Sequence, residues 1–167
     1  RMVHRNGLLY FAALGTASVI VTDINGEFRS RVEFLPLLPE DEKKKDGVES
    51  VGFTVDREGS IFLTMPVLFT VYKYSPEGRL TSFGRPGSAP GRFGIVAGIA
   101  SDSRGNLFVA DKLKSVVMVF DKDFNFLIEF GHRGLKPANL IVPDDIAIDR
   151  RDRVYVSQAR RRGVSVF

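Results

Sequence analysis

Few side chains in this sequence have the types and spacing that metal or acid–base chemistry requires. His4 and His132 are the only histidines and cysteine is absent, so a zinc site would have to be built mainly from carboxylates. Asp144 and Asp145 are adjacent acids whose oxygens suit a hard cation such as calcium. Because the pair directly follows Pro143, a polar turn is the favoured interpretation. We therefore predict no metal, no cofactor and no catalytic residue.

Basic side chains offer a second kind of chemistry, because each arginine fork can donate two parallel hydrogen bonds to a carboxylate or a phosphate. Residues 101–167 carry 12 Lys/Arg against 9 Asp/Glu, a small excess that is also typical of an ordinary solvated surface. No aromatic residue interrupts the run 160–162 to stack a nucleic-acid base. The basic candidates for partner binding are Arg85, Arg92, Lys112, Lys114, Arg133, Lys136, Arg160, Arg161 and Arg162.

The apolar segment 65–69 is a third candidate, because a hairpin loop is normally polar and an apolar one can mark an interface. Met65, Leu68 and Phe69 are its members with the largest side chains. An equally supported alternative is that the flanking strands are longer, so that Val67 and Phe69 fill space inside the fold.

The elements that position these residues are copies of one motif. It reads Asp-Arg-Glu-Gly-Ser-Ile-Phe-Leu at 56–63, and it recurs at 102–109, at 149–156 and, opening with His, at 4–11. Measured at Gly7, Gly59, Gly105 and Asp152, successive copies lie 52, 46 and 47 residues apart. Periods of this length are typical of propellers and other repeat arrays.

Each copy continues with the same pattern of strands and turns. A second polar turn begins 16 residues after each of the three motif glycines, at 23–26, 75–78 and 121–124. An apolar-rich run precedes each of these turns. Asp, Asn, Gly and Pro supply the backbone angles that hairpin turns need. We predict an all-β single domain over 1–167, with repeats at about 1–34, 49–83, 96–131 and 143–167.

The composition fits a β protein with its own core. The chain has 14 Phe, no Cys and no Trp, 44% of its residues are hydrophobic, and its formal net charge is +4. No run approaches the roughly 18 apolar residues of a membrane span. The segment 39–46 mixes acids with lysines, which predicts a mobile surface loop.

The third repeat resembles the NHL repeat, a β-propeller blade family. The resemblance rests on Gly105–Asp111, Val116–Asp121 and Phe126–Gly131, and on the glycine-rich link Phe83–Phe93. The sequence departs from the pattern elsewhere: Met65 and Gln158 stand where the third repeat has Asp111.

The resemblance implies a β-propeller of about four consecutive four-stranded blades. It also implies that the links between blades, 35–50, 83–96 and 131–143, share one face with the hairpin loops 13–18, 65–69, 111–115 and 158–163. On that face blades 1 and 2 would present apolar residues, and blades 3 and 4 the basic ones. Some NHL propellers bind single-stranded RNA, and related propellers include metal-dependent lyases and lactonases.

The ends of the chain lead to a further expectation. Only three residues precede the first motif and the last repeat stops at its third run, so we predict that the first and last blades are incomplete. The open edge of 8–12 would then be paired by further polypeptide or by another chain. The alternative is a complete small propeller with an irregular seam.

Register also predicts core positions. Tyr10, Phe62, Phe108 and Tyr155 lie three residues after the turn glycine or its equivalent, and we expect all four to be buried between blades.

We therefore expect a non-catalytic binding or scaffolding module that docks a protein, or another anionic partner, on the loops of its propeller. A propeller enzyme, a lyase or hydrolase with its catalytic residues mostly outside this segment, is one alternative, and single-stranded RNA binding on the basic face is another. Similarity to prokaryotic NHL-rich proteins favours an exported bacterial protein.

Overall fold

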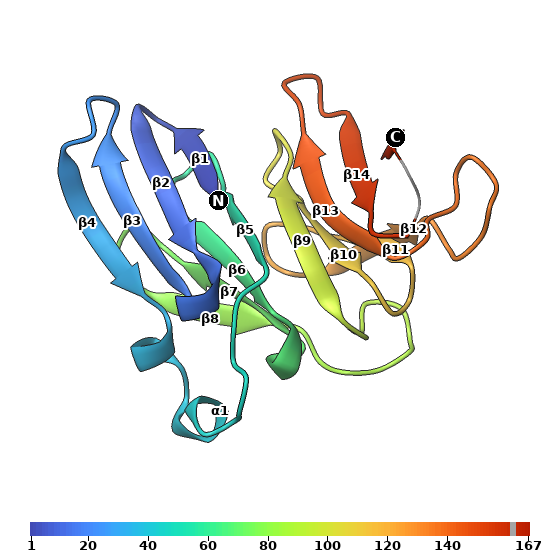
Figure 1. The fold of residues 1–167 in the computed structure, drawn as a ribbon, viewed down its shortest axis with the longest axis horizontal. Helices are drawn as coiled ribbons and strands as arrows, with labels where there is room; N and C mark the ends of the chain where they lie inside the picture. Colours follow the sequence, from blue (N-terminus) through green and yellow to red (C-terminus); the bar gives the residue numbers. More distant parts are fainter. Residues whose placement is uncertain (161–162) are drawn as a thin grey trace.

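The computed structural model describes residues 1–160 and 163–167, and these residues form four antiparallel sheets with little helix (Figure 1). Each sheet is a meander, so that neighbours in sequence are neighbours in the sheet. The strands are β1 (Met2–Arg5), β2 (Leu8–Ala13), β3 (Ser18–Asp23) and β4 (Phe28–Glu33) in blade 1; β5 (Gly52–Val55), β6 (Ile61–Met65), β7 (Thr70–Tyr74) and β8 (Leu80–Phe83) in blade 2; β9 (Val96–Ser101), β10 (Leu107–Asp111), β11 (Val116–Phe120) and β12 (Phe126–Phe130) in blade 3; and β13 (Pro143–Ile148), β14 (Val154–Gln158) and β15 (Val164–Val166) in blade 4.

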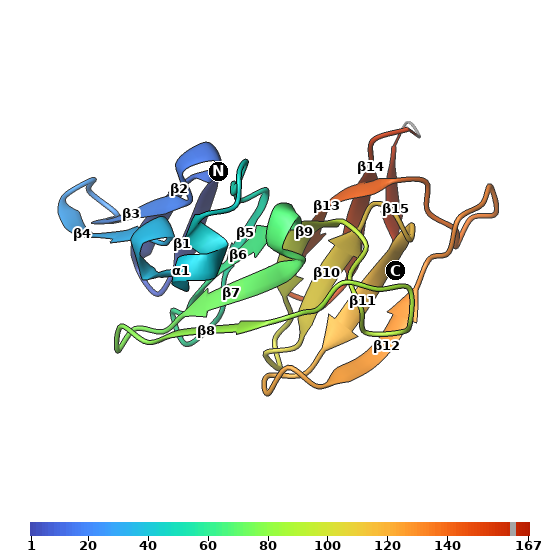
Figure 2. The same cartoon turned by 90° about the horizontal axis from the view of Figure 1, so that it is seen from below.

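The sheets are arranged as propeller blades. The first strands β1, β5, β9 and β13 face a common centre, and the last strands β4, β8 and β12 lie at the periphery (Figure 2). The short helix α1 (Glu40–Lys43) lies in the link between blades 1 and 2 and projects below the sheets in Figure 1. The prediction of an all-β, four-blade propeller is confirmed.

Polar turns at the opposite end from the links are closed by aspartates. Oδ1 of Asp102 accepts the backbone N–H groups of Arg104 and Asn106, both at 2.8 Å. Asp149 does the same for the N–H groups two and four residues further on, at 2.8 and 3.0 Å. Blade 1 differs, because its first hairpin is a two-residue Asn6-Gly7 turn with both φ angles positive, at 51° and 75°.

The core lies between the blades rather than within one of them. Three clusters of buried side chains separate blade 1 from 2, blade 2 from 3 and blade 3 from 4. At each interface an aromatic residue at the end of one blade packs on an aromatic residue of the next, with ring centroids 6.0, 4.9 and 4.7 Å apart in the pairs Phe34–Tyr74, Phe83–Phe120 and Phe130–Phe167.

Inner strands of neighbouring blades approach closely where a glycine replaces a side chain. A Cβ added at Gly52 would lie 2.2 Å from the carbonyl oxygen of Ala97, and one added at Gly98 would lie 2.5 Å from the Cα of Asp145. Thr64 Oγ1 donates a 2.6 Å hydrogen bond to the same Ala97 oxygen. These contacts fix β5, β9 and β13 relative to one another.

The expectation of an incomplete blade was wrong for blade 1 and right for blade 4. The first blade is complete: β1 pairs with β2 from Met2 opposite Phe11 to Arg5 opposite Leu8, so the edge of 8–12 is covered within the chain. Four residues suffice for this strand because the Asn-Gly turn is so short. The fourth sheet has three strands among the described residues, as predicted.

The four register aromatics divide into two pairs. Tyr10 and Phe62 are buried as predicted, with 5% and 2% of their surface exposed. The prediction was wrong in degree for Phe108 and Tyr155, which are only half-buried. Phe108 still packs against the cluster between blades 3 and 4, while Tyr155 is held from the side, its hydroxyl donating to Asp149 Oδ2 at 3.1 Å.

No helix within the described residues is both long and apolar enough to cross a lipid bilayer.

Candidate binding face at the blade links

The links between blades and the loops joining second to third strands meet at one end of the molecule, which we call the link face. It comprises the links 34–51, 84–95 and 131–142, the hairpin loops 14–17, 66–69 and 112–115, and residues 159, 160 and 163 after β14. Hydrogen bonds tie the two sets together. Ser50 Oγ donates to the Leu14 carbonyl at 2.8 Å, and the Ala159 N–H donates to the Val142 carbonyl at 2.9 Å.

Asp111 anchors the link into blade 3. Its carboxylate is fully buried and accepts the backbone N–H groups of Gly94 at 2.6 Å, Ile95 at 3.2 Å and Lys114 at 2.9 Å. At the equivalent position in blade 4, Gln158 Oε1 accepts the Ile141 N–H at 2.6 Å. The recurrent acid of the repeat is therefore a structural anchor here, since backbone amides use both of its oxygens.

The links 84–95 and 131–142 share one conformation. In each, an isolated bridge joins two positions, Pro86 with Phe93 and Arg133 with Leu140. Phe93 and Leu140 are fully buried. Side chains elsewhere in these links are mostly exposed, so the links display residues on a fixed frame.

Some of the basic candidates on the link 84–95 and the adjacent loop 112–115 already make contacts within the fold. Lys114 Nζ lies 3.0 Å from Glu129 Oε2 and also donates to the carbonyls of Ala89 and Arg92, at 3.2 and 3.4 Å. Arg85 is exposed and Arg92 is half-buried.

Lys112 is likewise engaged, in a 2.5 Å ion pair with Asp144. Its side chain remains one-third exposed, and this pair joins the hairpin loop of blade 3 to the first strand of blade 4.

The second link presents basic residues more openly. Arg133, Lys136 and Arg160 are all exposed, and no ion pair involves them within the part of the chain that the structure describes. Arg161 and Arg162 lie outside the described residues.

The apolar segment of blade 2 is mainly part of the core. Met65 is fully buried, Leu68 is 6% exposed, and both belong to the cluster between blades 1 and 2. Phe69 is half-buried against the next cluster. The alternative of longer strands fits only in part. β6 ends at Met65, a 3-10 turn covers Pro66–Leu68 and β7 begins at Thr70; Phe69 packs inside the fold, whereas Val67 is 41% exposed.

The link face also exposes apolar residues that the sequence did not single out, namely Leu37, with 46% of its surface accessible, and three residues on the side of blades 3 and 4. Ile95, Leu113 and Leu135 have 40%, 66% and 81% of their surface accessible. The position of Leu113 offered a signal. It lies at the tip of the loop that follows the buried Asp111, where side chains usually point outward. A Cβ added at Gly94 would lie 3.0 Å from the Leu113 Cβ, so Leu113 stands directly over the link.

A small pocket brings Arg85 and Arg92 next to phenylalanines. It has a volume of about 210 Å³, and its aromatic lining is Phe83, Phe120, Phe124 and Phe126. The rings of Phe83 and Phe124 stack with centroids 4.5 Å apart and planes 15° apart. This site could not be predicted from the sequence, because the rings come from two blades.

The acidic residues considered for a metal site lie apart or are paired with cations. No group of three or more His, Cys, Asp or Glu side chains is placed to hold a metal among the described residues. Asp144 and Asp145 lie in β13 and not in a turn, and each is engaged by a cation, Asp144 by Lys112 and Asp145 by Arg1 at 2.6 Å.

Comparison with known proteins places the chain among propellers, although no protein-family model matches it. It is 31% identical over 68 residues to the protein brain tumor of Drosophila melanogaster and 41% identical over 51 residues to the protein lin-41 of Caenorhabditis elegans, both NHL-repeat proteins. These matches cover 41% and 30% of this chain, and 7% and 4% of those relatives.

Solved structures show the same fold at low sequence identity. A streptogramin B lyase has a TM-score of 0.68 at 14% identity, and an inactive variant of virginiamycin B lyase from Staphylococcus aureus, with quinupristin, has 0.68 at 12%. A Bacteroides thetaiotaomicron protein of unknown function has a TM-score of 0.70 at 14% identity. Each match covers 96–97% of this chain and 45–49% of the other. The resemblance to the NHL repeat is confirmed, and the chain forms an NHL-type propeller array.

Proposed function

We propose that the chain is a non-catalytic binding module that docks an acidic protein segment on the link face of blades 3 and 4. The observation that carries this proposal is that one face exposes both apolar side chains, Leu113, Ile95 and Leu135, and basic ones, Arg133, Lys136 and Arg160. Protein interfaces combine an apolar centre with a polar rim in which arginine is enriched.

The frame beneath this surface supports binding by rigid display. The links are held by buried anchors, the Asp111 carboxylate and the side chains of Phe93 and Leu140. A loop that is ordered before its partner arrives loses less conformational entropy on binding. An acidic partner would pair with the exposed cations, while apolar residues on it would cover Leu113 and Ile95.

RNA binding is the second candidate, and the pocket beside Arg85 and Arg92 is the observation that favours it. Aromatic rings with arginines at their edge can stack a base and hold its phosphate. Three of the four rings are only half-buried. Exposed leucines at the link face have no use in this mode, which is why we rank it second. The enzyme alternative ranks third, because likeness to the lyases extends to the fold alone.

Selection from a displayed library of random peptides tests the proposal without a known partner. We expect the immobilised chain to enrich peptides that combine Asp or Glu with large apolar residues. The variant Arg133→Ala/Lys136→Ala/Arg160→Ala should lose this enrichment. Its matched control, Arg57→Ala/Arg104→Ala/Arg150→Ala, removes the same charge from exposed positions on the opposite end and should retain it.

Two results would overturn the proposal. One is equal loss in both triple variants, which would show that net charge alone attracts the peptides. The other is the absence of enrichment together with tight binding of single-stranded RNA, for which each neutralised phosphate contributes about 0.7 to the log–log salt slope. That result would establish the second candidate in its place.

A further inference from the structure

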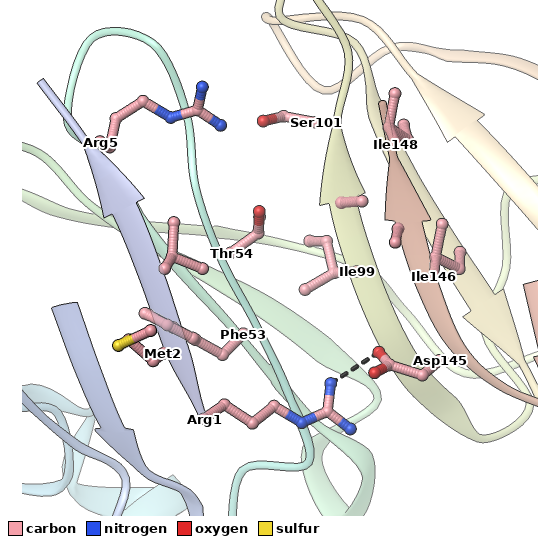
Figure 3. Close-up of a pocket in the computed structure, with 13 residues that line it drawn as sticks. Arg1, Met2, Arg5, Phe53, Thr54, Ile99, Ser101, Asp145, Ile146 and Ile148 are labelled. Carbon is pink, nitrogen blue, oxygen red and sulfur yellow. Dashed lines mark hydrogen bonds and ion pairs between the residues drawn. The ribbon is translucent and has the colours of Figure 1, made fainter. Parts of the chain in front are cut away.

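The first strands of all four blades surround a pocket of about 440 Å³ at the centre of the molecule (Figure 3). Its middle is apolar, with Phe53 from β5, Ile99 from β9 and Ile146 from β13 on the walls. Pockets of this size hold small organic ligands. The Arg1–Asp145 ion pair closes one end of the wall.

Three polar side chains gather at the other end. Arg5, Thr54 and Ser101 come from the last or next-to-last positions of β1, β5 and β9. Figure 3 shows the Arg5 guanidinium and the Ser101 hydroxyl directed toward one another, with the Thr54 hydroxyl pointing toward the space between them. Three different blades thus supply hydrogen-bond donors to one point.

Arg5 is not needed to close the turn that follows it. It is the last residue of its strand, where blades 2, 3 and 4 have Asp56, Asp102 and Asp149 closing a longer turn. Because the Asn6-Gly7 hairpin closes itself, no side-chain cap is needed. Its one protein hydrogen bond among the described residues runs from Nε to the Val55 carbonyl at 3.3 Å, which leaves both terminal NH₂ groups available.

The nearby carboxylates are engaged elsewhere. Asp56, next to Val55, accepts the Ser60 N–H at 2.7 Å and lies 3.9 Å from Lys73 Nζ. Asp145 pairs with Arg1. Within the described residues no carboxylate therefore lies at ion-pair distance from Arg5.

Thr54 is the second, independent sign of a ligand. Thr54 is only 8% exposed, and its hydroxyl has no hydrogen-bond partner among the described protein groups. The Ser101 hydroxyl likewise has no hydrogen-bond partner among them. A buried hydroxyl without a partner costs free energy. The equivalent positions of β9 and β13 are Ala100 and Ala147, so the fold does not require a hydroxyl there.

We propose that Arg5, Thr54 and Ser101 bind the carboxylate of a small organic acid whose apolar body lies against Phe53, Ile99 and Ile146. One guanidinium and two hydroxyls match the single charge and the four lone-pair sites of a carboxylate. A phosphate dianion would leave one charge uncompensated next to an apolar wall. The site is distinct from the link face, and the two proposals stand or fall separately.

Titration of the ¹⁵N-labelled chain with sodium benzoate tests this site, because benzoate pairs a carboxylate with a flat apolar body. We expect saturable shifts of the amide resonances around residues 5, 54 and 101. Benzyl alcohol has the ring without the charge, and inorganic phosphate has the charge without the ring. Each lacks one of the two contacts, so each should bind at least about tenfold more weakly than benzoate.

Three variants assign the contacts. Arg5→Gln should weaken benzoate about tenfold or more, and Thr54→Val and Ser101→Ala about three- to tenfold each, as expected for a charged and a neutral hydrogen bond. Arg57→Gln, an exposed arginine on the adjacent turn, is the matched control and should leave binding unchanged. Thr54→Val should leave the melting temperature unchanged or higher, because it removes a buried hydroxyl that the fold does not pair.

The proposal is overturned if benzoate gives no saturable shift up to about 50 mM, a concentration well above the Kd of even a weak ligand. It is also overturned if Arg5→Gln binds benzoate as well as the wild type, if phosphate competes on equal terms, or if the shifts centre on Arg1 and Asp145. Unchanged benzoate binding by both Thr54→Val and Ser101→Ala would overturn it as well, because neither hydroxyl would then contact the carboxylate.

Discussion

The links 34–51 and 84–95 occupy equivalent places in the molecule and are held there by opposite means. The first begins with the fully buried Phe34, adds the buried Leu38 and lies over Met65 in an apolar cluster. The second is held by the buried Asp111 carboxylate, which binds backbone N–H groups of the link directly. Met65 and Asp111 stand at the same repeat position, so one position supports a link either by burial or by hydrogen bonding.

The difference has a consequence for the surface. An apolar anchor must be covered, and the link 34–51 is accordingly long and folds back with α1, where Glu42 accepts a hydrogen bond from the Tyr72 hydroxyl. A carboxylate anchor needs only amides, so the link 84–95 stays short and leaves Arg85, Ile95 and the overlying Leu113 accessible. On the half of the link face with polar anchors, Leu113 and Leu135 are more exposed than any large apolar side chain of the other half, where Leu37 and Val67 reach 46% and 41%.

Exchanging the anchors gives the largest expected effect. Met65→Asp places a carboxylate in an apolar cluster with no donor at hand, and we expect it to lower the free energy of unfolding by about 4 kcal/mol or more. Urea unfolding measures this loss. Val67→Asp, two residues away and 41% exposed, should change stability by less than about 0.5 kcal/mol. Similar losses for the two variants would refute the assignment of Met65 to the core.

Removing the polar anchor should cost somewhat less. Asp111→Ala leaves three backbone N–H groups without their acceptor, and we expect a loss of about 2–4 kcal/mol in urea unfolding. Asp111→Asn keeps an acceptor oxygen and should fall between this variant and the wild type. Faster hydrogen exchange at Gly94 and Ile95 should accompany the loss, and unchanged exchange there would contradict the anchoring role.

The tie between α1 and blade 2 is expected to be weaker still. Tyr72→Phe removes the hydroxyl that donates to Glu42 while preserving the buried ring, so the free energy of unfolding should fall by about 1 kcal/mol. Burial and the nearby Glu42 carboxylate both raise the pKa of Tyr72, so its hydroxyl stays protonated in alkaline solution. Absorbance titration at high pH should find one tyrosine that ionises only on unfolding.

The smallest effect concerns the turns at the opposite end from the links. Burial raises the pKa of Asp149, but hydrogen bonds from the Arg153 amide and guanidinium, the Arg151 amide and the Tyr155 hydroxyl outweigh it and lower that pKa to about 2. A depressed pKa means that this stabilisation is complete above about pH 4 and is lost as pH falls through about 2. Asp149→Asn should therefore flatten the dependence of the melting temperature on pH in that window, and an unchanged slope would contradict it.

Much of the fold could be predicted because repetition exposes register. The motif at 56–63 and its copies placed the turns, and the period placed the blades. The first strand was missed because a two-residue Asn-Gly turn lets four residues complete a blade. Phe108 and Tyr155 were misjudged in degree, since their burial depends on how much neighbouring blade covers them.

The candidate site was less predictable. Charge identified Arg133, Lys136 and Arg160, but the partners that occupy Lys112 and Lys114 come from other strands and carry no local signal. The apolar run 65–69 indicates a binding surface, whereas Met65 and Leu68 are buried in one cluster with Phe34 and Leu38 of the link 34–51, and only Val67 stays exposed. Convergence of Arg5, Thr54 and Ser101 needs three blades and is invisible in any one of them.

The most direct test of the account is the affinity of the peptide selected by the wild-type chain for the single variant Leu113→Glu. Leu113 is two-thirds exposed on the half of the link face formed by blades 3 and 4, so the change should not disturb the fold. We predict an unchanged melting temperature and a Kd raised about tenfold or more, because an apolar contact is lost and a like charge faces the acidic peptide. An affinity within a factor of about two of the wild type would contradict docking on this face.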